Sequence, residues 1–177
     1  MLFTLQELFD VIVMTAAVGF IFKDIFKARG ELAHNSFWFA CAVTAPALIL
    51  HELSHKFVAL AFGLQATFHA AYAWLGLGIL LKLVNFNFIF FVPAYVSIEG
   101  AASNLASALI SGAGPGINLL LFLVSWALLR QKKLKTGTFL LLQATKQINL
   151  FLFIFNMLPL PFFDGLKFYQ GLWHVFF

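Results

Sequence analysis

The chain has 177 residues, of which 62% are hydrophobic and only 10% are charged, and its mean hydropathy is +0.94. A soluble domain carries about 25% charged residues because polar side chains must cover its surface, so this composition excludes most soluble folds. The apolar content also excludes disorder and collagen, and the single cysteine excludes a disulfide scaffold. The net charge is +4, and four of the eleven basic residues lie within 130–135, directly after an apolar stretch. That position is typical of a membrane topology or headgroup signal and argues against nucleic-acid binding.

The first two predicted elements are apolar helices. Residues 8–22 lack a basic leading segment and a small-residue cleavage pattern, so they predict a retained helix and not a signal peptide. The second predicted span covers 36–63. At about 1.5 Å per residue it is long enough to cross about 30 Å of hydrocarbon.

The stretch that follows, 64–103, leaves alternatives open. Its apolar run 70–92 carries one lysine and two asparagines, and it fits one span, a hairpin of two short spans or an insert that does not cross. The flanks 65–72 and 91–98 are rich in aromatic and β-branched residues, which favours short strands at the membrane edge.

Two long apolar segments come next, over 104–129 and 138–158, and a shorter one over 166–177 fits an amphipathic or interfacial helix. Small residues recur at four-residue spacing within 107–116. Such a face allows close helix packing, either within the chain or in a homo-oligomer.

The pattern therefore predicts an all-α polytopic membrane protein, a bundle of about five to six transmembrane helices with optional membrane-edge strands. We expect a single membrane-embedded domain over 1–177, with its core at about 36–167 and an extra N-terminal helix within 1–35.

His51, Glu52 and His55 form an HExxH pattern near the end of the second span. Residues four apart share a helix face, so both imidazoles can bind one metal while Glu52 approaches the water bound to it. Zinc accepts histidine nitrogen, and a catalytic zinc site keeps one position open for water. These groups are costly at membrane depth unless they satisfy one another or hold an ion, which favours a metal site.

A third protein ligand must come from few carboxylates. Asp164 follows Pro159 and Pro161, which break the preceding helix, and Gly165 after it permits an unusual backbone angle. Asp164 could therefore turn inward to a metal or serve as the N-cap of the last segment. Glu99, the only glutamate downstream of the motif, is an alternative ligand.

Asn118 ends the sequence GPGIN, which begins at Gly114 and Pro115 within the span 104–129. An asparagine in a spanning helix either makes a packing hydrogen bond or donates to a substrate.

Together these elements resemble the site-2 protease family of intramembrane zinc metalloproteases. The similar motifs are HELSH at 51–55, GPGIN at 114–118 and NMLPLPFFDG at 156–165, in the family's order. The resemblance implies one zinc ion held by His51, His55 and Asp164, with Glu52 as general base. It also implies that Asn118 positions the substrate or stabilises the oxyanion, supported by Gly114, Pro115, Asn156, Pro159 and Gly165.

The expected function is that of a zinc metalloendopeptidase. It would hydrolyse a peptide bond in or next to a transmembrane segment of a membrane-protein substrate, with the lipid bilayer as its other partner. A strand at 65–72 or 92–98 could bind the unwound substrate by edge addition. The alternatives are a membrane metal transporter, which would show several ligand clusters, and a catalytically silent substrate-binding relative.

Other polar residues have milder interpretations. Lys146, Asn149 and Asn156 lie close to one face of the last long span, which we expect to point into the bundle. Lys146 could instead extend to the interface. The remaining histidines are expected at interfaces, and they are His34, His69 and His174. His69 as a fourth ligand would indicate a latent site.

Basic connections at 23–29 and 130–135 predict a common cytoplasmic side and an even number of crossings in 64–103. The same rule places the HExxH end toward the outer face, whereas the family's site lies nearer the cytoplasm.

Overall fold

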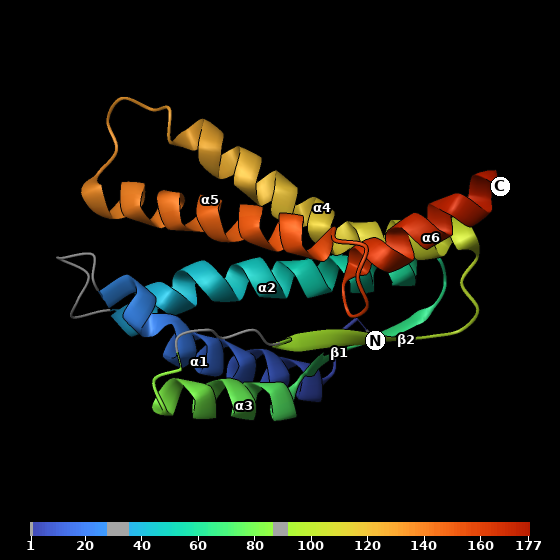
Figure 1. Cartoon of the computed structure of the whole chain (residues 1–177), viewed down its shortest axis with the longest axis horizontal. Coiled ribbons are helices and arrows are strands. Elements are labelled where there is room, and N and C mark those ends of the chain that lie inside the picture. Colours follow the sequence, from blue (N-terminus) through green and yellow to red (C-terminus); the bar gives the residue numbers. More distant parts are fainter. Residues whose placement is uncertain (1, 28–35, 87–91) are drawn as a thin grey trace. The chain divides into compact units, whose positions relative to one another are not determined.

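The computed structural model describes residues 2–27, 36–86 and 92–177 (Figure 1). Six helices and one two-stranded sheet lie within these ranges. In chain order they are α1 (Leu5–Lys27), α2 (Ser36–Ala61), β1 (Gln65–Ala70), α3 (Tyr72–Leu83), β2 (Ala94–Glu99), α4 (Asn104–Leu128), α5 (Thr136–Asn156) and α6 (Asp164–Phe176). The predicted helices and the predicted strand pair are all present, with ends shifted by a few residues.

Three of these helices, α2, α4 and α5, are long and apolar enough to cross a membrane. With six helices and two short strands in the described ranges, the predicted mostly helical character is confirmed. The total of five to six membrane spans stays a prediction. The helix α3 has only 12 residues, or about 18 Å at 1.5 Å per residue, which is too short to cross.

The end of α3 has a local cause. Asn85 lies just beyond the helix with φ of 54°, in the left-handed region that asparagine tolerates better than most residues. A residue in that conformation stops a helix, so the described part of the 70–92 run forms a short helix and not one span.

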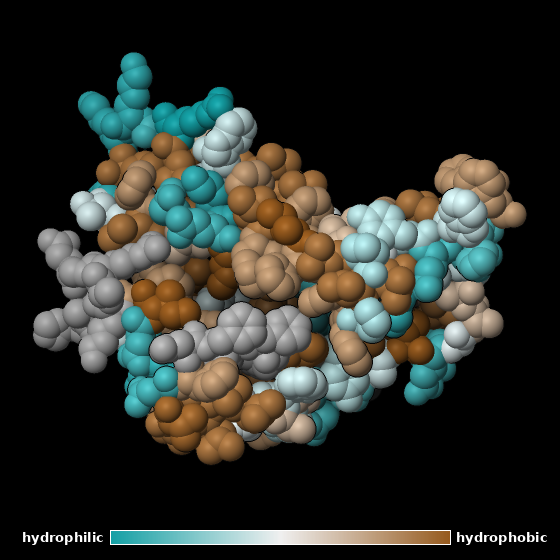
Figure 2. Space-filling view, in the orientation of Figure 1, coloured by the Kyte–Doolittle hydropathy of each residue, from teal (hydrophilic) through white to brown (hydrophobic). Residues whose placement is uncertain are grey.

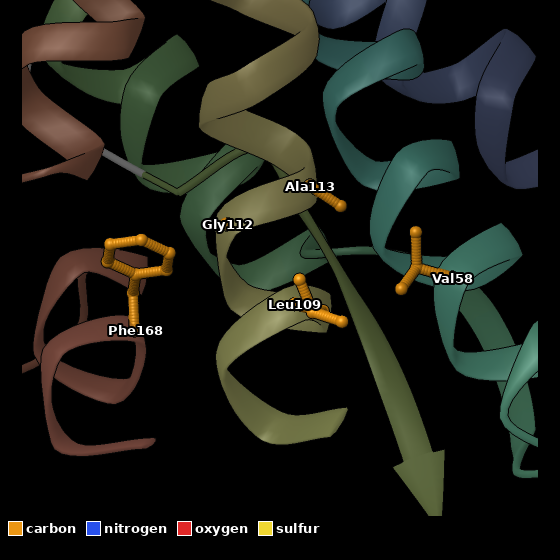
Figure 3. Close-up of a pocket in the computed structure, with 5 residues that line it drawn as sticks. All are labelled: Val58, Leu109, Gly112, Ala113 and Phe168. Carbon is orange, nitrogen blue, oxygen red and sulfur yellow. The ribbon is translucent and has the colours of Figure 1, made fainter. Parts of the chain in front are cut away.

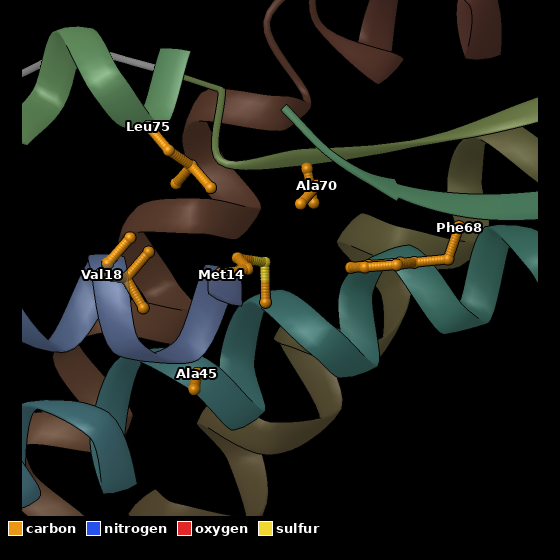
Figure 4. Packing of buried hydrophobic residues seen from close by; sticks show 8 residues of the cluster. Met14, Val18, Ala45, Phe68, Ala70 and Leu75 are labelled. Carbon is orange, nitrogen blue, oxygen red and sulfur yellow. The ribbon is translucent and has the colours of Figure 1, made fainter. Parts of the chain in front are cut away.

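The chain divides into two compact units, and the division runs through α2 and both strands. The first unit comprises Met1–Ile49 and Phe68–Tyr95. Figure 4 shows its core, where side chains from three helices and one strand meet. They are Met14 and Val18 of α1, Ala45 of α2, Phe68 and Ala70 of β1, and Leu75 of α3.

Two buried carboxylates of α1 bind the backbone of β1. Glu7 accepts a hydrogen bond from the Phe68 N–H at 2.8 Å, and Asp10 accepts one from the Ala70 N–H at 3.2 Å. Asp10 also accepts from the hydroxyl of Tyr72. Since β2 pairs with the other edge of β1, these carboxylates occupy the donors that a further strand would use.

The second unit comprises Leu50–Thr67 and Val96–Phe177. Ala59 of α2, Ala66 of β1 and Ile110 of α4 belong to one buried cluster, against which Val96 of β2 packs. The helix α6 packs closely on α4, because a Cβ on Gly171 would lie 2.8 Å from the Ala108 nitrogen. The small-residue face of 107–116 is thus contacted by α6 of the same chain, while a homo-oligomer stays a prediction.

The outer surface agrees with a lipid environment. Figure 2 shows hydrophobic side chains over much of the visible face, with hydrophilic atoms gathered at the connection between α4 and α5. Large exposed apolar side chains on these two helices include Leu120, Trp126, Phe151 and Ile154. In water such a surface would be costly, whereas lipid accepts it.

Candidate metal centre

The two histidines of the HExxH pattern lie one turn apart on α2, and both are buried. Their Nε2 atoms are 3.1 Å from each other. Asp164, the first residue of α6, places its Oδ2 3.1 Å from the Nε2 of His51 and 3.2 Å from that of His55. Residues 113 positions apart in sequence thus converge on one point.

The other nitrogen of each ring faces an oxygen. Nδ1 of His55 lies 2.7 Å from the backbone carbonyl oxygen of Ile110, and Nδ1 of His51 lies 2.6 Å from Oδ1 of Asn118. Both oxygens accept, so each Nδ1 carries the hydrogen and each neutral ring presents a bare Nε2 lone pair. Metal-binding histidines in proteins are oriented in this way.

The three converging atoms fit a zinc ion. Two bare nitrogens and a carboxylate oxygen within about 3.2 Å repel one another unless a cation or a proton lies among them. Tetrahedral zinc with bonds of about 2.0–2.1 Å separates its ligand atoms by about 3.3 Å. Within the described ranges, His51, His55 and Asp164 are the residues that form such a donor group.

The chain reaches Asp164 through a tight connection after α5. Phe162 has φ of 77°, which is strained for a bulky residue, and its side chain is exposed. A Cβ on Gly165 would lie 2.5 Å from the Met157 carbonyl oxygen, so only glycine lets α6 begin this close to the end of α5. This close approach brings the Asp164 carboxylate back toward α2.

Asp164 starts α6 without capping it, since the N-cap residue is Phe163. Burial alone would raise the pKa of the Asp164 carboxyl. Hydrogen bonds and charge from His51 and His55, when these are protonated, instead hold this pKa well below its usual range.

Gly114 of α4 forms one wall of the site. A Cβ at this position would lie 2.3 Å from Nε2 of His55 and 2.6 Å from Nε2 of His51. The next residue, Pro115, is buried and has no N–H to donate within the helix. The beginning of GPGIN thus provides the space in which the two ring nitrogens meet.

The remaining predicted site residues occupy distinct places. Glu52 is half-buried beside His51, and its carboxylate interacts electrostatically with both histidines and with Asp164. Asn118 is fully buried and donates from Nδ2 to Oδ1 of Asn149 at 2.8 Å. The predicted contact of Asn118 with the substrate stays a prediction. Asn156 donates to the Leu152 carbonyl on α5 at 3.0 Å.

Other candidate ligands lie elsewhere. Glu99 is exposed at the end of β2, and the ring of His69 packs on Tyr95 with centroids 5.3 Å apart. His174 is exposed near the end of α6. His34 lies outside the described residues.

Two hydrogen-bond partners around the donors, one bound to His55 and one bound to Asn118, could not be assigned from the sequence. The Ile110 carbonyl has no side-chain signature, and Asn149 gave only a weak signal as a polar residue on an inward helix face. Its partner Asn118 is 31 positions away, a pairing that helix periodicity does not specify.

An apolar pocket of about 420 Å³ lies in the second unit (Figure 3). Val58 of α2, Leu109, Gly112 and Ala113 of α4, and Phe168 of α6 line it. Val58 follows His55 by three residues and Ala113 precedes Gly114, so the pocket walls continue directly from the elements that carry the donors.

An HExxH helix whose two histidines converge with an aspartate is typical of metal-dependent hydrolases of the zinc metalloprotease class. The chain is 33% identical over 166 residues to a Methanocaldococcus jannaschii protein provisionally named a zinc metalloprotease. The match covers 93% of this chain and 84% of that relative, and the chain therefore belongs to the same zinc metalloprotease family. No family model matches the sequence, and no solved structure matches it.

Proposed function

We propose that this protein is an intramembrane-cleaving zinc metalloprotease of the site-2 type, a multi-pass membrane protein that cuts substrates in or next to a transmembrane segment. The observation that carries the proposal is the position of the donors. His51 and His55 lie on α2, a helix long and apolar enough to span a membrane, and Asp164 meets them from α6. A peptide bond cut there would lie at membrane depth.

His51, His55 and Asp164 would hold the zinc ion, which supplies a water of pKa near 7 and polarises the substrate carbonyl. Glu52 is the base of this proposal. Its carboxylate takes a proton from the attacking water and delivers it to the leaving amine. Its position next to His51 on α2 keeps it near the donors without making it one of them.

The strands suggest how an extended substrate is bound. Glu7 and Asp10 already accept from the outer amides of β1, so we assign edge addition to β2. Val96 of β2 packs on the cluster that contains Ile110, whose carbonyl binds His55. A peptide added to β2 would thus lie beside elements that hold the site.

Replacing the base tests the chemistry. We expect Glu52→Gln to bind zinc like the parent protein and to cleave a reconstituted single-span model substrate at least about 100-fold more slowly. Ser54→Ala is the matched control within the same motif, because the Ser54 hydroxyl only donates to the Leu50 carbonyl of α2. Equal cleavage by Glu52→Gln and the parent would overturn the assigned base.

Mapping the cut by mass spectrometry tests where cleavage occurs. Products that end inside or beside the substrate's apolar segment support the proposal, and cuts confined to its soluble parts contradict it. Zinc binding without cleavage of any substrate would instead favour the silent relative or the metal transporter.

A further inference from the structure

A row of buried amides leads away from the metal centre. Nδ2 of Asn149 donates to the backbone carbonyl of Thr145 at 2.8 Å, and Oδ1 of Asn149 accepts from Nδ2 of Asn118 at 2.8 Å. Oδ1 of Asn118 then accepts from Nδ1 of His51 at 2.6 Å. Asn118 and Asn149 are both completely buried.

The Thr145 carbonyl determines the direction of every bond in this row. A carbonyl can only accept, so the atom of Asn149 that faces it must be the amide nitrogen. The amide oxygen of Asn149 then faces Asn118 and requires a donor there. That requirement turns the oxygen of Asn118 toward His51, and Nδ1 of His51 must carry the hydrogen.

Both histidines carry their hydrogen on Nδ1, but the oxygen that accepts it differs between them. The Ile110 carbonyl faces His55 directly and cannot be reversed. His51 faces a side-chain amide, which can rotate by half a turn and offer its nitrogen instead. A reversed Asn118 would place the hydrogen of a neutral His51 on Nε2, where it blocks metal binding.

We propose that Asn149 is a positioning residue for the metal centre. By fixing the orientation of Asn118, it keeps the hydrogen of His51 on Nδ1 and leaves Nε2 bare for zinc. The assignment rests on the proposed zinc site. It gives His51 an oriented acceptor equivalent to the backbone carbonyl that serves His55.

The first test is zinc affinity, measured on purified protein by competition with a chelator. We expect Asn149→Leu, which is similar in size but has no amide, to lower the affinity about tenfold. Gln143→Leu makes the same kind of exchange on α5 and should stay within about twofold of the parent. Asn149→Ala is measured in parallel, so that a folding defect of one variant does not end the test.

A double-mutant cycle separates orientation from packing. Asn118→Ala removes the amide through which Asn149 is proposed to act, so Asn149 can no longer influence the His51 hydrogen by this route. In that background we expect Asn149→Leu to change zinc affinity by less than about twofold. If Asn149 acted only through packing, Asn149→Leu would lower zinc affinity by the same factor in both backgrounds, because the same side chain is removed.

The metal-free protein gives an independent signature. The ¹⁵N shifts of the His51 ring distinguish the two neutral tautomers, with His51→Gln identifying the signal. We expect the parent to carry the hydrogen on Nδ1 and Asn149→Leu to show a mixture. Equal affinity losses in both backgrounds, or an unchanged tautomer in Asn149→Leu, would overturn this inference alone. Failure of the parent to bind zinc would overturn the proposed function as well.

Discussion

Gly114→Ala is the smallest change that should disable the metal centre. The added Cβ would lie 2.3 Å from Nε2 of His55 and 2.6 Å from Nε2 of His51, whereas ordinary contacts begin at 3.4 Å. One or both rings must therefore retreat by about 1 Å, and a displacement of that size at a reacting centre costs about 100-fold in rate. We expect a similar or larger loss of turnover, together with weaker zinc binding by about tenfold or more.

The matched control lies two residues along the same helix. A Cβ on Gly116 meets nothing within 4 Å, so Gly116→Ala should keep zinc and activity. It should even stabilise α4 by about 0.5–1 kcal/mol, the usual preference of a helix interior for alanine. Zinc affinity by chelator competition, substrate cleavage and thermal unfolding in detergent are measured for both variants. If Gly114→Ala matches Gly116→Ala in affinity and turnover, the glycine does not define the site as we describe.

Three further predictions address the ligand, the first unit and the pocket. Asp164→Ala should lower zinc affinity by more than about 100-fold because a direct ligand is lost, and metal analysis after dialysis would show it; full zinc retention would contradict the ligand set. Asp10→Ala should destabilise the first unit by about 2 kcal/mol, since its carboxylate accepts from the Ala70 amide and from Tyr72 in a buried setting. The control Asp24→Ala changes another acidic residue of α1 and breaks its partly exposed ion pair with Lys82 of α3. It should cost under about 1 kcal/mol in the same unfolding assay, and a loss equal to that of Asp10→Ala would contradict the special role of Asp10. Ala113→Leu should narrow the apolar pocket and raise KM for substrates with a bulky apolar residue at the cut more than for those with a small one; uniform effects would argue against a specificity pocket.

The residues of the candidate metal site could be selected from the sequence because their chemistry is local in sequence or costly in lipid. His51 and His55 share a helix face by their spacing alone, and the surrounding apolar run made their presence hard to explain without an ion. For Asp164 the residues alone leave a ligand role and an N-cap role open, and the ligand role is what the resemblance of NMLPLPFFDG to the family motif implies. The structure brings all three together.

Hydropathy could not decide what the 70–92 run forms. Its hydropathy is high on both sides of Lys82, Asn85 and Asn87, so the pattern is the same whether the helix continues past these residues or stops after 12 residues. The backbone of Asn85 decides it, through a conformation that the residue tolerates but does not require.

The buried contacts of Glu7 and Asp10 also could not be predicted from the sequence. An acidic residue in an apolar helix signals a polar partner, yet the partners here are backbone amides of β1, about 60 residues away. Backbone groups have no residue type, so pattern reading cannot locate them. The same applies to the Ile110 carbonyl at His55.

The meeting of α2 with α6 has a mechanical consequence. An ion bound by His51, His55 and Asp164 ties together two helices separated by most of the second unit's chain, with 113 positions between His51 and Asp164. Because the folded chain binds the ion and the unfolded chain does not, the ion stabilises the fold by an amount that grows with the logarithm of the free metal concentration. The candidate metal centre would then also stabilise the fold. Removing the metal should loosen α6 before the rest of the second unit unfolds, and the free zinc concentration should set both the proposed activity and the stability of the fold.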